Sequence, residues 1–310
     1  MRALVTGATG FVGRKLLERL ERPVVLSRDA ERAKRSLPQG VSVFAWDPLK
    51  EPAPAAALAG IDTVFHLAGD PVAEGRWNDE KRRRIRESRT IGTANLVRGI
   101  AAAATKPATL VSASAIGYYG SRGDETLDES ASAGSDFLAQ VCIEWEREAA
   151  AVESLGVRAA MARIGIVLGD GGALKKMLLP FKLGLGGRLG AGKQWMSWVH
   201  VDDVVGMLLH AANDPSVRGP FNCVGPKPVT NAEFTKAVGR AVHRPTIFPV
   251  PPIALKLAVG DFAEVLLASQ RCVPKKMLAA GYTFKYPTVD SAMQAAVNGE
   301  AARGEAVAAK

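Results

Sequence analysis

Short apolar runs alternate with amphipathic stretches through the first half of the chain. The apolar runs end in polar or glycine-containing turns and predict β-strands at residues 3–6, 23–27, 41–46, 63–67, 109–113 and 158–164. Apolar residues at helical spacing lie between them and predict helices at residues 11–20, 30–36, 55–59, 78–104 and 137–154. Buried strands that alternate with helices indicate a parallel sheet covered on both faces. The predicted fold class is therefore α/β, with a doubly wound parallel sheet of the Rossmann type.

The second half of the chain has a different pattern. A glycine-rich loop is expected at 184–192, and further strands and helices are expected at 195–201, 202–212, 220–224 and 231–242, the last with Thr230 as its N-cap. Prolines between 245 and 252 mark a connection, and mixed helix and loop follow over 253–294. We expect a cofactor domain at 1–165, a smaller substrate lobe at 166–297 and a flexible tail at 298–310, with elements from about 195–225 joining either part.

The first predicted strand runs directly into a turn that contains three glycines. The strand, the turn and the following helix N-terminus predict a dinucleotide site, because glycines allow a diphosphate to approach the backbone and unpaired N–H groups favour its negative charge. The residues expected to contact the cofactor here are Gly7, Thr9, Gly10, Phe11, Val12 and Gly13. The alternative is a tight strand-to-helix turn that binds nothing.

The end of the second predicted strand indicates which cofactor is preferred. A carboxylate that holds a free ribose is usual there, but this chain has Arg28, preceded by Ser27. Because a guanidinium pairs well with a 2′-phosphate, we predict NADP(H) over NAD(H). Asp29 keeps open the alternative of a solvated surface arginine. Asp47 lies at the end of the third strand, where it is placed either to meet the adenine amino group or to cap the turn at Pro48.

Small residues follow the fourth predicted strand and permit close approach of the backbone to a cofactor. They are Leu67, Ala68 and Gly69, and His66 before them is expected to be structural. Arg89 and Arg163 complete the predicted cofactor-contacting set. Together with Arg122 they are also the candidate cations for a neighbouring tyrosine.

Composition narrows the possible partners. The 310 residues carry a formal net charge of +9, and a basic run at 81–86 is interleaved with acidic residues, as on a solvated helix face. No nucleic-acid module accompanies that run, so nucleic acid is not an expected partner. No apolar run reaches a membrane-spanning length, so no membrane partner is expected either. Three widely spaced cysteines, a chain that begins directly with a strand and no metal-ligand spacing predict a cytoplasmic protein without a metal.

Several motifs together resemble the extended short-chain dehydrogenase/reductase superfamily, which contains sugar-nucleotide epimerases and dehydratases. They are the glycine turn, His66-Leu67-Ala68-Gly69 and Val199-His200-Val201-Asp202-Asp203. The segments at 112–120, 194–198 and 269–276 resemble one atypical branch, the "epimerase family proteins", whose small C-terminal domain has no assigned function. This resemblance extends to about Val297 and implies an NADP(H)-binding fold.

One departure from the superfamily concerns catalysis. The resemblance implies a proton-transferring tyrosine with a lysine four residues later, yet none of the four tyrosines has that partner. The catalytic candidates that remain are Ser114 after the fifth strand, where the superfamily has a serine or threonine that hydrogen-bonds the substrate, and Tyr118 and Tyr119 in the following loop. Each has a structural alternative: a strand-end hydroxyl for Ser114 and a pocket wall for the tyrosines. Cys142, where the lysine is expected, is interpreted as a core residue.

Aromatic and polar side chains after the glycine-rich loop predict the rim of a substrate pocket. They are Gln194, Trp195, Ser197 and Trp198, and the alternative is a hairpin that packs on the lobe. The predicted function is an NADP(H)-dependent oxidoreductase or epimerase-like enzyme for a small or sugar-like substrate, with an anionic substrate as one option. The alternative is a catalytically silent NADP(H)-binding regulator or redox sensor. A homo-oligomer is compatible with the sequence.

Overall fold

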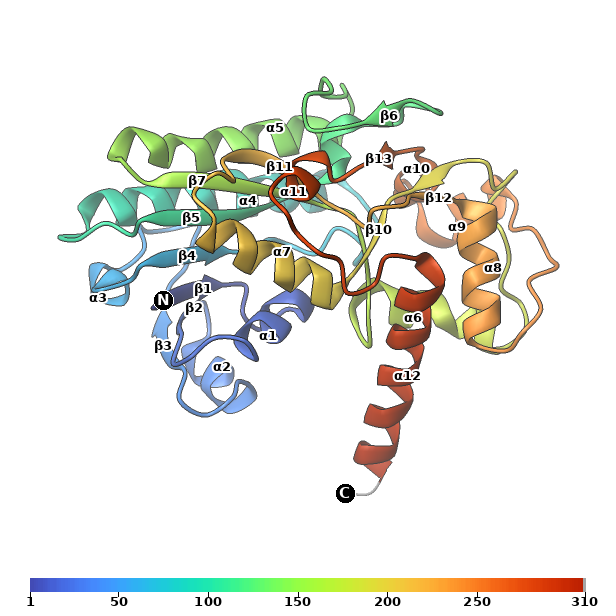
Figure 1. The fold of residues 1–310 in the computed structure, drawn as a ribbon, viewed down its shortest axis with the longest axis horizontal. Coiled ribbons are helices and arrows are strands. Elements are labelled where there is room, and N and C mark those ends of the chain that lie inside the picture. The colour runs from blue at the N-terminus through green and yellow to red at the C-terminus, as the bar shows by residue number, and fades with distance from the viewer. Residues whose placement is uncertain (309–310) are drawn as a thin grey trace.

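A seven-stranded parallel sheet forms the centre of the computed structural model, which describes residues 1–308 (Figure 1). Its strands are β1 (Ala3–Thr6), β2 (Val24–Ser27), β3 (Ser42–Ala45), β4 (Thr63–His66), β5 (Thr109–Ala115), β7 (Arg158–Ile164) and β11 (Gly219–Cys223). They lie in the order β11-β7-β5-β4-β1-β2-β3, and every neighbouring pair is parallel. The winding direction reverses between β1 and β4, which is where ligands bind in open α/β sheets. The predicted fold class is confirmed.

Helices cover both faces of this sheet (Figure 1). One face packs on α1 (Phe11–Leu17), α2 (Ala30–Ser36) and α7 (Val201–Asn213), and the other on α3 (Ala55–Leu58), α4 (Asp79–Ala102), α5 (Phe137–Ala150) and the 3₁₀ helix η2 (Ala151–Leu155). Side chains alternate between the two faces along each strand, so that Val5 belongs to the first core and Leu4 to the second. Both side chains are fully buried.

The remaining elements build the smaller lobe and its junction with the sheet. They are η1 (Ile116–Tyr119), β6 (Thr126–Leu127), β8 (Ile166–Leu168), α6 (Gly172–Lys182), β9 (Trp195–Met196), β10 (Trp198–His200), β12 (Val229–Thr230), α8 (Asn231–Ala241), α9 (Pro252–Val259), α10 (Phe262–Leu267), β13 (Arg271–Cys272), α11 (Lys275–Ala279) and α12 (Val289–Ala308). A separate apolar core that includes Trp198, Phe234 and Met293 holds the lobe together. The lobe therefore has its own buried centre beside the central sheet.

Local capping interactions explain where several helices begin. The carboxylate of Asp29 accepts the Arg32 N–H at 2.9 Å at the start of α2. At the start of α8, Thr230 and Glu233 form a reciprocal capping box, which confirms the predicted N-cap. Each such cap contributes about 1 kcal/mol of helix stability.

The structure departs from the predicted elements mainly in the second half of the chain, where α6 was not predicted and two predicted segments differ in form. The strand predicted at 195–201 is two short strands, because β9 pairs with β12 and β10 pairs with β8. Ser197 lies between them, bonded to the main chain at Gln270 and Cys272. The tail predicted at 298–310 continues α12 as far as Ala308, since its alanine-rich sequence favours helix, and residues 309–310 lie outside the described part of the chain.

Candidate functional site

The glycine turn between β1 and α1 is packed too tightly for any side chain at two of its three glycines. A Cβ atom on Gly7 would lie 2.6 Å from the carbonyl carbon of Leu67, and one on Gly13 would lie 2.3 Å from the carbonyl oxygen of Gly7. Gly7 also has a φ of +69°, which side chains disfavour, and its carbonyl accepts the Gly10 N–H at 3.0 Å. The turn thus brings bare backbone to the point between β1 and β4 where the winding reverses.

The first turn of α1 has no side-chain cap. Gly10 is the N-cap residue and offers no side-chain acceptor to the amides that follow. Those N–H groups and the helix dipole form a favourable environment for an anion. The residues present therefore fit a diphosphate: a bare backbone cradle that a Cβ would fill, followed by uncapped amides.

Phe11 has a role that the sequence did not predict. Cβ atoms placed on Gly169, Gly171 or Gly172 would lie 2.6 to 2.9 Å from its ring. The ring therefore packs directly against the loop that precedes α6, and only the main chain of Phe11 remains for a phosphate group. The Gly-Asp-Gly-Gly sequence at 169–172 was the available signal for this contact.

Arg28 is exposed at the carboxyl end of β2. It makes no hydrogen bond or ion pair with any other described residue, although its charge contributes to lowering the pKa of Asp47. The main cause of that lowered pKa is the hydrogen bond from the Leu49 N–H at 3.1 Å, with Lys50 3.2 Å away adding to it. Asp47 thus caps the turn at Pro48, and Arg28 remains available to a ligand.

The segment after β4 forms the other side of the glycine turn. Leu67 contacts Gly7, and Ala68 donates its N–H to the Thr6 hydroxyl at 3.3 Å. Gly69 lies against Arg89, whose guanidinium would be 3.1 Å from a Cβ at that position.

Main-chain carbonyls hold the Arg89 guanidinium in place. Its Nη1 donates to Asp70 at 3.1 Å and to Ile85 at 3.0 Å, and its guanidinium lies 5.0 Å from the Trp145 ring. Burial lowers the pKa of Arg89. The structure therefore places Arg89 beside the strand ends that the sequence assigned to the cofactor.

His66 is structural, as its position at a strand end predicted. It is fully buried, and its two ring nitrogens lie 2.7 Å from the Thr6 hydroxyl and 2.9 Å from the Thr93 hydroxyl. Burial, with a smaller effect from Arg89, lowers its pKa to about 4. The ring is therefore neutral at physiological pH and holds β1, β4 and α4 together.

A buried ion pair joins the end of β7 to α5, the helix on which the superfamily resemblance implied a tyrosine and a lysine. Arg163, at the end of β7, donates two parallel hydrogen bonds of 2.8 Å to the carboxylate of Glu146 on α5. Ser114 donates to the same carboxylate at 2.7 Å. Burial alone lowers the pKa of Arg163, but the bonds to Glu146 outweigh it and raise the pKa overall. The hydroxyl of Ser114 is thus committed to a structural partner.

Tyr119 is part of the same network. It is fully buried, accepts from Arg163 Nη1 at 2.9 Å and donates to Asn222 Oδ1 at 2.7 Å. Burial raises its pKa well above the usual value. These contacts favour a positioning role for Tyr119, and its predicted catalytic role stays a prediction.

Tyr118 differs from Tyr119 because it is only half-buried. The guanidinium carbon of Arg163 lies 3.4 Å from the centre of the Tyr118 ring, and the two tyrosine rings meet edge to face at 5.3 Å. Cys142 nearby is buried, and burial, with the Glu146 charge, raises its pKa to about 12, so the thiol stays protonated. Tyr118 is therefore the most accessible of the predicted catalytic side chains.

Sequence reasoning missed two members of this network, Glu146 and Asn222. Asn222 donates to the carbonyls of Leu127 and Val273, which joins β11 to the junction with the lobe. Neither residue belongs to a recognisable motif. The available signals were the position of Glu146 on the buried face of a predicted helix and that of Asn222 within a predicted strand. Among the described residues, no group of three or more His, Cys, Asp and Glu side chains is arranged to hold a metal ion.

The predicted pocket rim is corrected in part. Ser197 and Trp198 are each 1 % exposed, and the Trp198 indole N–H is satisfied by the Lys227 carbonyl at 2.9 Å, so neither lines an open pocket. Trp195 remains at the surface, bonded to Asp124 at 2.7 Å and covered by the Arg271 guanidinium at 4.3 Å.

Gln194 also stays partly accessible, with its amide 3.3 Å from the Leu189 carbonyl. Trp198 points inward because β10 enters the lobe core. Ser197 points inward because its hydroxyl bonds the main chain at Gln270 and Cys272.

Comparisons with known proteins agree with this geometry. The sequence profile of the NAD dependent epimerase/dehydratase family matches residues 3–224, and that of a domain of unknown function (DUF1731) matches residues 250–296. The chain is 40 % identical to epimerase family protein Mb2239 of Mycobacterium bovis over 291 residues, which cover 93 % of this chain and 95 % of that one. It is 39 % identical to the chloroplastic epimerase family protein SDR39U1 homolog of Arabidopsis thaliana, covering 95 % and 86 %.

A solved structure is also similar along nearly its whole length. The crystal structure of human epimerase family protein SDR39U1 with NADPH superimposes with a TM-score of 0.84 at 31 % identity, covering 96 % of this chain and 99 % of that one. That human protein was crystallised with NADPH, and the fold that surrounds the glycine turn is shared.

Proposed function

The chain belongs to the NAD dependent epimerase/dehydratase family, and from that premise we propose that it is an NADP(H)-dependent oxidoreductase or epimerase-like enzyme. The observation that carries the proposal is the glycine cradle with an unpaired arginine beyond the next strand. Gly7 and Gly13 leave no room for side chains, and Arg28 has no partner among the described residues. The substrate class is small or sugar-like, and an anionic group on it suits Arg271 beside Trp195.

Different residues around the glycine turn would bind different parts of the cofactor. Main-chain amides after Gly10 would bind the diphosphate, and Arg28 with Ser27 would bind the 2′-phosphate of NADP(H). When bound, NADP(H) supplies hydride transfer, which no side chain can perform. Gly69 and Arg89 would border the cofactor at the end of β4, where the sequence predicted close backbone approach.

Tyr118 is the side chain best placed to handle a proton in the proposed reaction. It is half-buried, and the Arg163 guanidinium carbon lies 3.4 Å from the centre of its ring. Glu146 fixes the position of Arg163 through two hydrogen bonds. In this arrangement an arginine, held by a carboxylate, takes the supporting place that a lysine has in the superfamily.

Replacing Arg28 with alanine should weaken NADPH binding about tenfold and leave NADH binding unchanged. The substitution removes the guanidinium and with it a charge-assisted contact to the 2′-phosphate, a group that NADH lacks. Titration calorimetry with both nucleotides measures the two affinities. Arg35→Ala, at an exposed position in the last turn of α2, is the matched control. Equal loss for both nucleotides, or no preference for NADPH in the unmodified protein, would contradict the assignment.

A second candidate function is a catalytically silent NADP(H)-binding regulator. It is favoured by the hydrogen bonds that already occupy Ser114 and Tyr119 and by the protonated thiol of Cys142. In a regulator, the same network would hold η1 rigidly and transmit the cofactor state to a partner. Its distinguishing property would be tight cofactor binding without turnover.

A turnover assay distinguishes the proposed enzyme from the catalytically silent regulator. Purified protein is incubated with NADP(H) and a panel of sugar nucleotides, aldoses and small carbonyl compounds. Loss of the reduced-nicotinamide absorbance reports net reduction, and chromatography of the sugars reports epimerisation, which leaves the redox state of the cofactor unchanged. We expect turnover that Tyr118→Phe reduces and that Tyr286→Phe, a change in the lobe, leaves intact. Cofactor binding without turnover on any member of the panel would favour the regulator.

We also propose a reducing cytoplasmic location, supported by three cysteines that are all free and buried. A small-molecule substrate remains the proposed partner, and self-association remains compatible with the sequence.

A further inference from the structure

The formal net charge of the chain comes from two segments of the lobe. Residues 171–201 contain five lysines and arginines, residues 234–260 contain four, and neither segment contains an aspartate or a glutamate. These nine account for the whole net charge of +9, so positive and negative side chains balance over the rest of the chain. Such a concentration of one sign indicates an anionic partner for this part of the lobe.

The same two segments carry most of the exposed large apolar side chains among the described residues. Ile247, Phe248, Ile253 and Leu257 are 62 to 77 % exposed, and Leu183 and Leu185 are 65 to 66 % exposed. Monomeric soluble proteins seldom gather exposed aliphatic residues in this way without a partner surface.

The two segments run side by side, so charge and apolar surface are continuous. Arg244 Nε donates to the Lys182 carbonyl at 3.2 Å, and the Val250 N–H donates to the Arg188 carbonyl at 2.8 Å. Gly190 completes this pairing by donating to Val250 at 2.9 Å. The segment after α8 forms the outer edge of the lobe, away from the central sheet (Figure 1).

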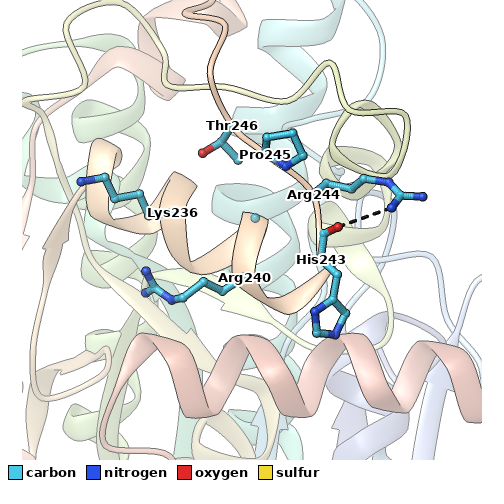
Figure 2. A pocket seen from close by; sticks show the side chains of 7 residues that line it. Lys236, Arg240, His243, Arg244, Pro245 and Thr246 are labelled. Atoms are coloured by element: carbon cyan, nitrogen blue, oxygen red, sulfur yellow. Dashed lines mark hydrogen bonds between the residues drawn. The ribbon is translucent and has the colours of Figure 1, made fainter.

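A basic hollow lies next to the exposed apolar side chains. Figure 2 shows Lys236 and Arg240 projecting from α8, with His243 and Arg244 on the turn that follows. Arg240 is paired with Asp290 of α12, whereas Lys236 and Arg244 form no ion pair with any described residue, although the charge of Lys236 contributes to lowering the pKa of Glu233. The hollow therefore suits a phosphate group immediately beside Ile247.

We propose that this face, the lobe tip, docks on the surface of an anionic phospholipid bilayer. The lobe tip is defined by the apolar side chains of Leu183, Leu185, Ile247, Phe248, Ile253 and Leu257 together with the cations at Arg188, Lys236, Arg244 and Lys256. The apolar side chains enter the boundary between headgroups and acyl chains, and the cations, with the hollow, meet lipid phosphates.

Two properties of the lobe tip favour lipid over other occupants. Prolines at 245, 249, 251 and 252 remove main-chain N–H groups that would otherwise lack partners in an apolar phase. A second copy of the chain would bring like charges together, and the apolar residues are mainly aliphatic, which gives nucleic-acid bases little to stack on.

The proposed contact is peripheral. No helix in the described part of the chain combines the length and the apolarity that crossing a bilayer requires. The sequence-based expectation of no membrane partner rested on that criterion, which does not address attachment to one leaflet.

Vesicle cosedimentation tests the proposal with the full chain. The probes are vesicles of phosphatidylcholine alone and vesicles that also contain about 30 % phosphatidylglycerol, at about 0.1 M salt. We expect at least about tenfold stronger partitioning onto the anionic vesicles, and loss of this preference at about 0.5 M salt. Ile247→Ser with Phe248→Ser should lower partitioning about tenfold by removing buried apolar area. Lys236→Glu with Arg244→Glu should lower it at least as much.

A matched control variant changes the net charge by the same amount at positions far from the lobe tip. Lys106→Glu with Arg147→Glu alters two exposed positions on the sheet domain and should leave partitioning within about twofold of the unmodified protein. NADPH affinity, unchanged in all variants, reports that each is folded.

Three results would overturn the proposal. One is protein that stays in the supernatant with anionic vesicles. Another is an equal loss in the control variant, which would mean that net charge alone acts. The last is a dimer in sedimentation velocity that Ile247→Ser with Phe248→Ser dissociates while vesicle binding is absent, which would assign the lobe tip to a second copy.

Discussion

Replacing Gly13 with alanine should weaken NADPH binding at least about a hundredfold, since the site must distort to accept one methyl group. The new Cβ would lie 2.3 Å from the Gly7 carbonyl oxygen and 2.7 Å from the Ala8 Cα, and both neighbours are main chain that cannot rotate away. α1 would move off β1 and carry its uncapped amides away from the diphosphate. Titration calorimetry with NADPH measures the loss.

Gly92→Ala is the control for this substitution. Gly92 lies within α4, where an added Cβ would meet only the Pro48 side chain at 3.4 Å. Alanine is favoured over glycine in a helix by about 1 kcal/mol, so the control should bind NADPH normally and unfold at the same or higher denaturant concentration. Full NADPH affinity in Gly13→Ala would show that the cradle does not hold the diphosphate.

Replacing Glu146 with alanine should destabilise the protein by about 3–5 kcal/mol, because it leaves the Arg163 guanidinium buried without its counter-charge. Arg163 is 2 % exposed and Glu146 is 8 % exposed, so water cannot take the place of the carboxylate. The Ser114 hydroxyl would lose its acceptor as well. Urea unfolding followed by tryptophan fluorescence reports the change in free energy.

The double variant Glu146→Leu with Arg163→Met shows whether Glu146→Ala destabilises the protein because it leaves the buried Arg163 charge unpaired. Removing both partners with apolar residues of similar size should cost much less than removing Glu146 alone. If the single and double variants lose the same free energy, the effect comes from packing around α5 and not from the charge. Arg147→Ala, at the exposed position next to Glu146 in the sequence, removes only a surface ion pair with Glu148 and should have a negligible effect.

The central sheet and the glycine turn could be predicted because the sequence patterns that indicate them involve neighbouring residues. The strand β7 and the helix α2 were predicted with their observed bounds, since period and capping are properties of neighbouring residues. The glycine turn was recognisable for the same reason, because its conformation is fixed by three residues within one turn. Arg28 could be placed at the end of β2 from spacing alone, and its freedom from partners followed only from the structure.

The network around Arg163 could not be predicted, because it joins residues that are far apart in sequence. Glu146 lies on α5, Asn222 on the edge strand β11 and Tyr119 at the end of η1, and only the packing of these elements on β7 brings their polar atoms together. The error at Ser197 and Trp198 has a related origin. A strand residue points inward or outward according to which strand it pairs with, and the two partners of β9 and β10 lie elsewhere in the chain.

The position of β11 has a consequence for how this protein is made. β11 is the outermost strand beside β7, yet the ribosome synthesises it only after the whole segment that begins the lobe. Until then the growing chain presents β7, which is apolar except for Arg158 and Arg163, as an open edge with unpaired amides and carbonyls. Nascent chains that stall before residue 219 are therefore the species most exposed to aggregation, and the ones with most need of a chaperone.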